Sequence, residues 1–197
     1  MVDVEREWEP RILGLGGTTR QGSSSERALR AALDLAERAG AHTDILLADD
    51  LEFRAYAPER GALEPRAGRL LDLVRRADGL IVASPGFHGG PSGLIKNALD
   101  HLEELRDDER PYLDGRAIGC IVCAAGWQAT TTTLAALRQT VHSLRGWPTP
   151  LGVTINSTPV GDADPVVAAT PQLGMLVDQV VALARWQRAA AFVEVAS

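Results

Sequence analysis

Short runs of apolar residues recur along this chain, each followed by a longer segment whose apolar positions have helical spacing. The runs occupy residues 11–17, 43–49, 79–85, 116–125 and 149–156. They are apolar throughout rather than alternating, which is typical of strands covered on both faces. The pattern therefore predicts five buried strands of a parallel sheet.

Segments with apolar residues three and four positions apart separate these runs and predict five helices. They lie around residues 24–36, 70–74, 94–102, 134–144 and 171–192. Because parallel strands need crossover connections, this alternation indicates an α/β fold with helices on both faces of the sheet. The length of 197 residues fits one domain, so we expect an N-terminal tail at 1–10 and a single domain at 11–197.

Ligands of such sheets bind beyond the carboxyl ends of the strands. This rule selects three predicted loops, residues 16–24, 84–93 and 124–131. A fourth irregular segment, residues 49–65, either lines the mouth of a pocket or covers the edge of the sheet.

Composition and charge exclude several classes of function. The formal net charge is −6 and the residues form no basic stripe, which argues against nucleic acid and anionic membranes as partners. The first ten residues are charged, unlike a signal or transit peptide, and no apolar run approaches the roughly 18 residues of a membrane span. Two cysteines do not make a secreted disulfide framework. We therefore expect a cytoplasmic protein.

The first loop lies in the stretch "GLGGTTRQGSSSERALRAAL", residues 14–33. The Walker pattern fails because Ser23 stands where its lysine is needed. The dinucleotide pattern G-x-G-x-x-G fails because Thr19 occupies the place of its third glycine. Neither nucleotide motif is therefore present.

The composition of this loop suits a terminal phosphate monoester instead. Thr18, Ser23 and Ser25 offer hydroxyl donors, and the predicted helix N-terminus near Ser24 attracts anions. Hydrogen bonds to a charged group contribute about 1.5–3 kcal/mol each, enough to anchor a ligand but not to hold it alone. The alternative interpretation is a serine-rich N-cap on a surface helix.

The second loop lies within "ASPGFHGGPSGLIKNALDHL", residues 83–102. Pro85 stiffens it, Phe87 and His88 project from it, and Gly89 permits close approach of a ligand to the backbone. An apolar wall with main-chain donors along its rim suits a planar aromatic ligand. Ser92 can cap the next helix. The alternative is a glycine-proline turn with a buried Phe87.

Taken together, the two loops resemble those of NAD(P)H-dependent FMN reductases. Residues 17–25, "GTTRQGSSS", resemble the family pattern G-S-x-R-x-x-S-x-N, and residues 84–100 are similar to its P-x-Y-[NH]-G…L-K-N-x-x-D segment. The resemblance spans about residues 11–157. It implies a flavodoxin-like fold, a three-layer sandwich around a five-stranded parallel sheet, usually assembled as a homodimer or homotetramer with FMN near a subunit interface.

The resemblance also implies roles for individual residues. The FMN phosphate would be held by Thr18, Arg20, Ser23 and Ser25, although Arg20 could instead serve the 2′-phosphate of NADPH. The isoalloxazine ring would lie along Pro85, Gly86, Phe87, His88 and Gly89. The third loop would touch the pyrimidine edge through Gly126 and Trp127. Two departures from the family pattern stand out, because Phe87 lacks the usual tyrosine hydroxyl and Trp127 replaces a small residue.

The remaining reactive side chains indicate no further chemistry. Cys120 and Cys123 lie three apart on a predicted strand, so they face opposite sides of the sheet and fill the core. Lys96 and Asp100 are spaced for a helical ion pair. The sequence predicts no catalytic acid–base pair, no nucleophile and no metal site.

The resemblance implies an oxidoreductase that passes hydride from NADPH or NADH to FMN and then electrons to a small-molecule acceptor. Free flavin, a quinone and an azo compound are the candidate acceptors. A non-enzymatic electron carrier like flavodoxin is the alternative, and a regulatory protein that kept the fold and lost the ligand is a second one.

Overall fold

The structure is a computed structural model and describes residues 8–158 and 162–195. Its strands are β1 (Arg11–Gly16), β2 (His42–Leu46), β3 (Gly79–Phe87), β4 (Gly90–Pro91), β5 (Ala117–Ala124), β6 (Trp147–Pro148) and β7 (Val153–Asn156). Its α-helices are α1 (Ser24–Arg38), α2 (Ala48–Leu51), α3 (Pro65–Arg76), α4 (Gly93–Asp100), α5 (Trp127–Ser143), α6 (Pro165–Ala168) and α7 (Thr170–Val195). Short 3-10 helices cover η2 (Pro58–Arg60) and η3 (His101–Leu105).

The sheet has the strand order β2-β1-β3-β5-β6, and all neighbours along this path are parallel. The fifth position is shared, because both β6 and β7 pair with β5. β4 is a short antiparallel addition to the end of β3. Successive strands are added on one side of β1 and then, from β3 onward, on its other side, so the winding direction reverses between β1 and β3. This is the flavodoxin-like order, and it confirms the predicted fold.

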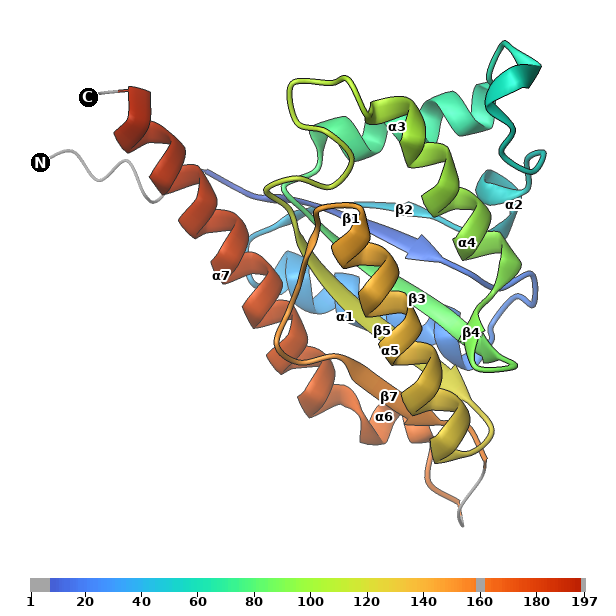
Figure 1. The fold of residues 1–197 in the computed structure, drawn as a ribbon. Helices are drawn as coiled ribbons and strands as arrows, with labels where there is room; N and C mark the ends of the chain where they lie inside the picture. Colours follow the sequence, from blue (N-terminus) through green and yellow to red (C-terminus); the bar gives the residue numbers. More distant parts are fainter. Residues whose placement is uncertain (1–7, 159–161, 196–197) are drawn as a thin grey trace, which may run out of the picture.

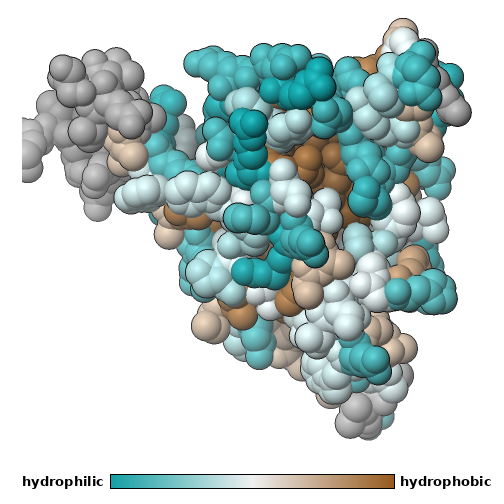
Figure 2. All heavy atoms as spheres, in the orientation of Figure 1, coloured by the Kyte–Doolittle hydropathy of each residue, from teal (hydrophilic) through white to brown (hydrophobic). Residues whose placement is uncertain are grey.

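Two hydrophobic clusters lie on opposite faces of the sheet and make the three layers. One cluster joins the sheet to α3, α4, η3 and α5, and the other joins it to α1, α6 and α7. Figure 1 shows this arrangement, with the strands β1, β3 and β5 all pointing toward the β3–β4 hairpin. On the face seen in Figure 2, hydrophilic side chains dominate and apolar ones appear mainly in hollows between them.

Helix α1 illustrates how the sequence specifies an element. Ser23 caps it by accepting a hydrogen bond from the Glu26 backbone N–H, and Arg38 lies in the last turn, where the helix dipole favours a cation. Alanine and leucine residues at helical spacing form its buried face, namely Ala28, Leu29, Ala32, Leu33 and Ala36.

Several predicted boundaries differ from the structure. The second strand, expected at 43–49, ends at Leu46, and of the run 149–156 only residues 153–156 form a strand, β7, while β6 lies just before the run. The third strand runs past residue 85 to Phe87, since pairing with β4 keeps its end extended. The third loop is shorter than predicted, because α5 already begins at Trp127.

Arg116, just before β5, is buried, and its side chain donates hydrogen bonds to backbone carbonyl groups around it. Its guanidinium donates hydrogen bonds to carbonyls of Arg75, Ala77, Tyr112 and Asp114 at 3.1–3.3 Å. Desolvation lowers the pKa of this guanidinium to about 10. The side chain thus joins α3, the 112–114 turn and β5.

The division into a tail at 1–10 and one domain at 11–197 stays a prediction, and residues 1–7 lie outside the described residues. No described helix is long and apolar enough to cross a membrane.

Candidate functional site: a cleft at the carboxyl ends of β1, β3 and β5

A cavity of about 620 Å³ lies where β1, β3 and β5 end, a volume in the range of small-molecule sites. We call it the main cleft. Its walls come from four segments: residues 17–25, the β3–β4 hairpin with the start of α4, the end of β5 with the first turn of α5, and Ser157 after β7. The two loops that the sequence analysis singled out therefore face one cavity.

Hydroxyl groups crowd the first wall of the main cleft. Thr18 Oγ1 accepts a hydrogen bond from the Arg20 N–H at 3.2 Å, and Ser23 Oγ accepts one from the Glu26 N–H at 3.3 Å. The hydroxyls of Ser23 and Ser25 lie 3.2 Å apart. Because a hydroxyl can accept and donate at once, these contacts leave O–H protons for an acceptor in the cleft.

The N-terminus of α1 opens into the same wall. Helix geometry leaves the N–H groups of Ser24 and Ser25 without intrahelical acceptors. The Glu26 carboxylate, nearly buried, accepts hydrogen bonds from the Gly22 N–H and from Arg30 Nε, both at 2.9 Å. Its charge is therefore paired within α1, and the helix end keeps donors for an external anion.

Arg20 is exposed at the rim of this wall. Within the residues that the structure describes, its guanidinium takes part in no ion pair, whereas Arg27 and Arg30 of the following helix are both paired. Arg20 is thus a cation available to a ligand.

The second wall is the β3–β4 hairpin. Pro85, Gly86 and Phe87 line the main cleft, and the Phe87 side chain is 58% exposed. The buried Ser84 hydroxyl accepts a hydrogen bond from the Ser92 N–H at 2.9 Å, which fixes the hairpin to the start of α4.

Other predicted residues of this loop lie elsewhere or act differently. His88 and Gly89 form the hairpin tip, both with positive φ, and are not among the cleft-lining residues. Ser92 caps α4 as predicted, by accepting a hydrogen bond from the Ile95 N–H, and it also lines the cleft.

Two glycines permit the close approach of these walls. A Cβ on Gly17 would overlap Cγ1 of Ile95 and come within 2.7 Å of Ser92 Oγ in α4. A Cβ on Gly86 would lie 2.9 Å from Thr133 Oγ1 and 3.1 Å from the Ala124 Cβ. Glycine at both places lets the loops pack without side chains between them.

The third wall consists of small residues, Ala124, Ala125, Ala129 and Ser157. Gly126, with φ 101°, starts α5, and Trp127 is 63% exposed. The Trp127 side chain lines a neighbouring cavity of about 530 Å³ beside β7 and α6 rather than the main cleft. Small residues thus shape this wall, and the tryptophan stands on its outer side.

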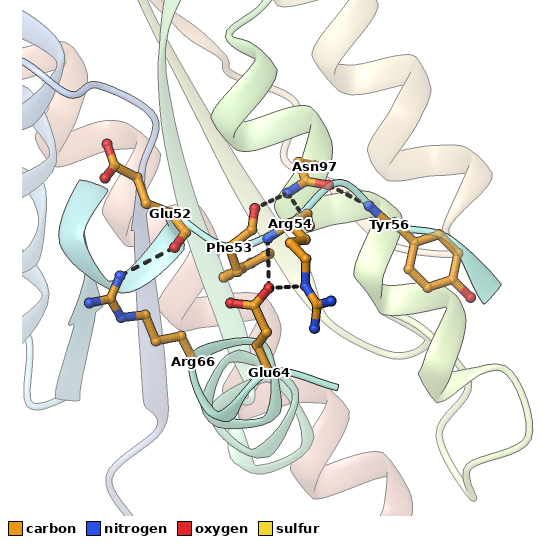
Figure 3. A network of polar contacts seen from close by, with 7 residues as sticks. All are labelled: Glu52, Phe53, Arg54, Tyr56, Glu64, Arg66 and Asn97. Atoms are coloured by element: carbon orange, nitrogen blue, oxygen red, sulfur yellow. Dashed lines mark hydrogen bonds and ion pairs between the residues drawn. The ribbon is translucent and has the colours of Figure 1, made fainter. Parts of the chain in front are cut away.

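The segment after α2 lies against α4, and the described residues of 49–65 do not line the main cleft. The Asn97 side chain holds it to α4, since Asn97 accepts from the Tyr56 N–H at 2.9 Å and donates to the carbonyls of Phe53 and Arg54 (Figure 3). Residues 52–56 and α4 enclose an open groove, which shares Gly93 and Leu94 with the main cleft.

The two cysteines occupy opposite faces of the sheet, as predicted. Burial raises the pKa of both thiols to about 12. Cys123 lines the floor of the main cleft but is protonated at neutral pH and therefore a poor nucleophile. No group of three metal-ligating side chains occurs in residues 8–158 and 162–195.

The structure therefore brings seven of the predicted site residues into one cleft: Thr18, Arg20, Ser23, Ser25, Pro85, Gly86 and Phe87. His88, Gly89, Gly126 and Trp127 surround it without lining it. The sequence analysis selected the loop 124–131, which supplies most of the third wall, but it assigned no role to the alanines of that loop or to Ser157. It also missed Asn97 and Asn156, whose hydrogen bonds join segments far apart in the chain.

A parallel sheet in flavodoxin-like order, with a hydroxyl-rich loop and a cleft at the switch point, defines a flavodoxin-like α/β protein. Comparison with known sequences gives the family, since residues 10–160 match the NADPH-dependent FMN reductase family. The chain belongs to this family of NAD(P)H-dependent flavin oxidoreductases, which confirms the predicted resemblance and enzyme class.

Individual relatives agree with this membership. An NAD(P)H-dependent FMN reductase of Pseudomonas aeruginosa is 31% identical over 133 residues, which are 66% of this chain and 69% of that protein. An FMN-dependent NADPH-azoreductase of Staphylococcus aureus is 28% identical over 110 residues, 56% of this chain and only 55% of that protein. The solved structure of RosB with a bound riboflavin-5′-phosphate derivative matches with a TM-score of 0.72 at 18% sequence identity. The match covers 91% of this chain and 80% of the RosB chain. At this low identity it supports the fold alone.

Proposed function

We propose that this chain binds FMN in the main cleft, takes reducing equivalents from NADPH or NADH, and passes them to a small-molecule acceptor. The observation that carries the proposal is the convergence of the hydroxyl-rich loop 17–25 and the apolar end of β3 on one cavity of about 620 Å³. One wall suits a phosphate and the other suits a flat apolar ring. FMN carries both of these groups in one molecule.

The donor set of the first wall fits a phosphate monoester. Thr18, Ser23 and Ser25 would hold it with their hydroxyls, and Arg20 would add the charge that the loop otherwise lacks. Charge-assisted hydrogen bonds of this kind contribute about 1.5–3 kcal/mol each.

The second and third walls fit a planar ring. Pro85, Gly86 and Phe87 would lie against the isoalloxazine, together with the alanines at the end of the adjacent strand β5. His88, Gly89, Gly126 and Trp127, which surround the cleft, would meet the ring edge or an incoming substrate. These residues orient the ring and keep water from part of it.

FMN held by these residues would supply the redox chemistry, namely hydride transfer from a nicotinamide and electron transfer to an acceptor. The chain's own task is therefore binding and orientation, which agrees with the predicted lack of a catalytic acid–base pair. Cys123 at the cleft floor takes no part, since burial raises the pKa of its thiol to about 12.

The candidate electron acceptors follow from the names of the relatives and from the flat aromatic character that the acceptors share. The names of the Pseudomonas and Staphylococcus relatives support free FMN and an azo compound as acceptors, and a quinone has the same flat aromatic character. Steady-state kcat/KM for the three acceptors, measured in parallel, identifies the preferred one.

A flavodoxin-like electron carrier is the alternative, although membership in a reductase family argues against it. Anaerobic stopped-flow mixing with NADPH separates the two. We expect direct bleaching of the flavin, whereas a carrier would stay oxidised. A protein that stays colourless after incubation with FMN would contradict both.

The binding mode is tested with Arg20→Ala, with the exposed Arg38→Ala at the other end of α1 as the control. Loss of one charge-assisted bond should raise the FMN Kd by roughly tenfold or more. If Arg20→Ala keeps the FMN affinity but raises the KM for NADPH and not for NADH, Arg20 serves the 2′-phosphate instead. Equal affinity and kinetics would contradict both roles.

A homodimer or homotetramer and a cytoplasmic location stay predictions. Size-exclusion chromatography with light scattering, with and without FMN, tests the assembly.

A further inference from the structure

Asn156, the last residue of β7, lies where the ladder between β5 and β7 ends. Its backbone stands in register with Ala124, the last residue of β5. Beyond this pair the two strands separate into the loop that starts α5 and the loop that leads to α6. Both loops contribute to the third wall of the main cleft, through Ala125 and Ser157.

The carboxamide of Asn156 connects these two loops. Its Oδ1 accepts the Gly126 N–H at 2.9 Å and the Thr158 N–H at 3.0 Å. The Ser157 N–H between them donates to the Ala124 carbonyl at 2.9 Å. One side-chain oxygen therefore extends the ladder past its last backbone pair, and we call these two hydrogen bonds the Asn156 bridge.

We propose that Asn156 is a positioning residue of the main cleft, which holds the third wall in its ligand-binding shape through the Asn156 bridge. The side chain does not line the main cleft, since Asn156 faces the neighbouring cavity with Trp127. It acts through the backbone of Gly126 and of residues 157–158. The identity of the ligand rests on the proposed function.

The physical reason is the cost of ordering loops on binding. Without the Asn156 bridge, two backbone N–H groups turn to water and the loops that carry Ala125 and Ser157 gain conformational freedom. A ligand that contacts these loops must then order them on binding, and this entropy loss reduces the binding free energy. Gly126 increases the effect, because its φ of 101° is a conformation that glycine leaves easily.

Three variants separate positioning from general stability. Asn156→Ala removes the Asn156 bridge, whereas Asn156→Asp has the same shape and keeps an acceptor oxygen. Thr154→Ala is the matched control, because Thr154 is half-buried two residues earlier on the same side of β7 and also lines the neighbouring cavity. No described hydrogen bond uses the Thr154 hydroxyl.

The first measurement is amide hydrogen exchange of the ligand-free protein. We expect Asn156→Ala to speed exchange at Gly126 and Thr158, and Asn156→Asp and Thr154→Ala to leave it near wild type. Unchanged exchange in Asn156→Ala overturns the proposal. This comparison does not depend on FMN and remains decisive if the proposed function fails.

The second measurement is FMN titration, with visible circular dichroism of the saturated complexes. Loss of the Asn156 bridge should raise the FMN Kd by about tenfold and alter the flavin dichroism, while Asn156→Asp stays within about threefold of wild type. Wild-type affinity in Asn156→Ala, despite faster exchange, overturns the link between the bridge and the cleft. A wild-type protein that binds no FMN contradicts the proposed function instead.

Discussion

Replacement of Gly17 by alanine tests how closely the phosphate-type loop must pack on the first turn of α4. Gly17 follows β1 directly, and its N–H donates to the Ala83 carbonyl at 2.8 Å. An added Cβ would overlap Cγ1 of the fully buried Ile95 and stand 2.7 Å from Ser92 Oγ, the N-cap of α4. Ile95 is β-branched and in a helix, so its side chain cannot rotate away cheaply.

The expected loss of stability follows from these contacts. Overpacking a well-filled core costs about 1–3 kcal/mol, and disturbing an N-cap costs about 0.5–2 kcal/mol. We expect Gly17→Ala to lower the free energy of unfolding by about 2–4 kcal/mol. Relief by movement of the loop would shift Thr18 away from the hairpin, so FMN affinity should fall as well.

Urea unfolding and FMN titration measure the two effects, with Gly68→Ala as the control. Gly68 lies inside α3, and a Cβ there would have no heavy atom within 4 Å. This control should raise stability by up to about 1 kcal/mol through helix propensity and leave FMN binding unchanged. A Gly17→Ala protein within about 0.5 kcal/mol of wild type would refute the packing argument.

Three further predictions concern the core. Arg116→Ala leaves four carbonyls without the guanidinium donor and should lower the free energy of unfolding in urea by at least about 3 kcal/mol. The control Arg38→Ala, at an exposed position, should lower it by less than about 0.5 kcal/mol. Similar losses in the two variants would contradict the role of Arg116. The buried thiols should resist a thiol reagent at pH 8 until urea unfolds the chain, and rapid modification of the folded protein would show that they are accessible. Because burial raises the pKa of both thiols from 9.0 to about 12, their contribution to stability is complete below pH 9 and is lost as the pH rises from about 9 to 12. Urea unfolding at pH 8 and 10.5 checks this, and the Cys120→Ala/Cys123→Ala double variant should show a smaller loss between the two pH values.

Local chemistry explains which parts of the site could be predicted. The 17–25 loop combines several hydroxyl side chains and one arginine directly before a helical pattern, so the prediction of an anion site follows from the sequence alone. The predicted strand at 79–85 already includes Pro85, but the continuation of β3 through Gly86 to Phe87 could not be predicted, because glycine is a poor strand residue. Pairing with β4 overrides that preference.

The small residues of the third wall and the groove between residues 52–56 and α4 could not be predicted in detail, because these residues are ordinary until the fold brings them together. Ala124, Ala125 and Ser157 become a wall only when β7 pairs with β5. Asn97 and Asn156 hold loops through hydrogen bonds to backbone groups 30 to 44 residues away. An asparagine in the sequence does not reveal which distant amide its side chain will meet.

The α/β class, the succession of strands and helices, and the two loops with recognisable chemistry follow from the order of the residues. Periodicity and capping act over a few residues, so the chain displays them directly. The short strands β6 and β7, the place of Trp127 outside the main cleft and the groove beside α4 emerge only in the folded molecule. These features depend on packing and on hydrogen bonds between distant segments, which are fixed by the shape of the folded sheet and its layers.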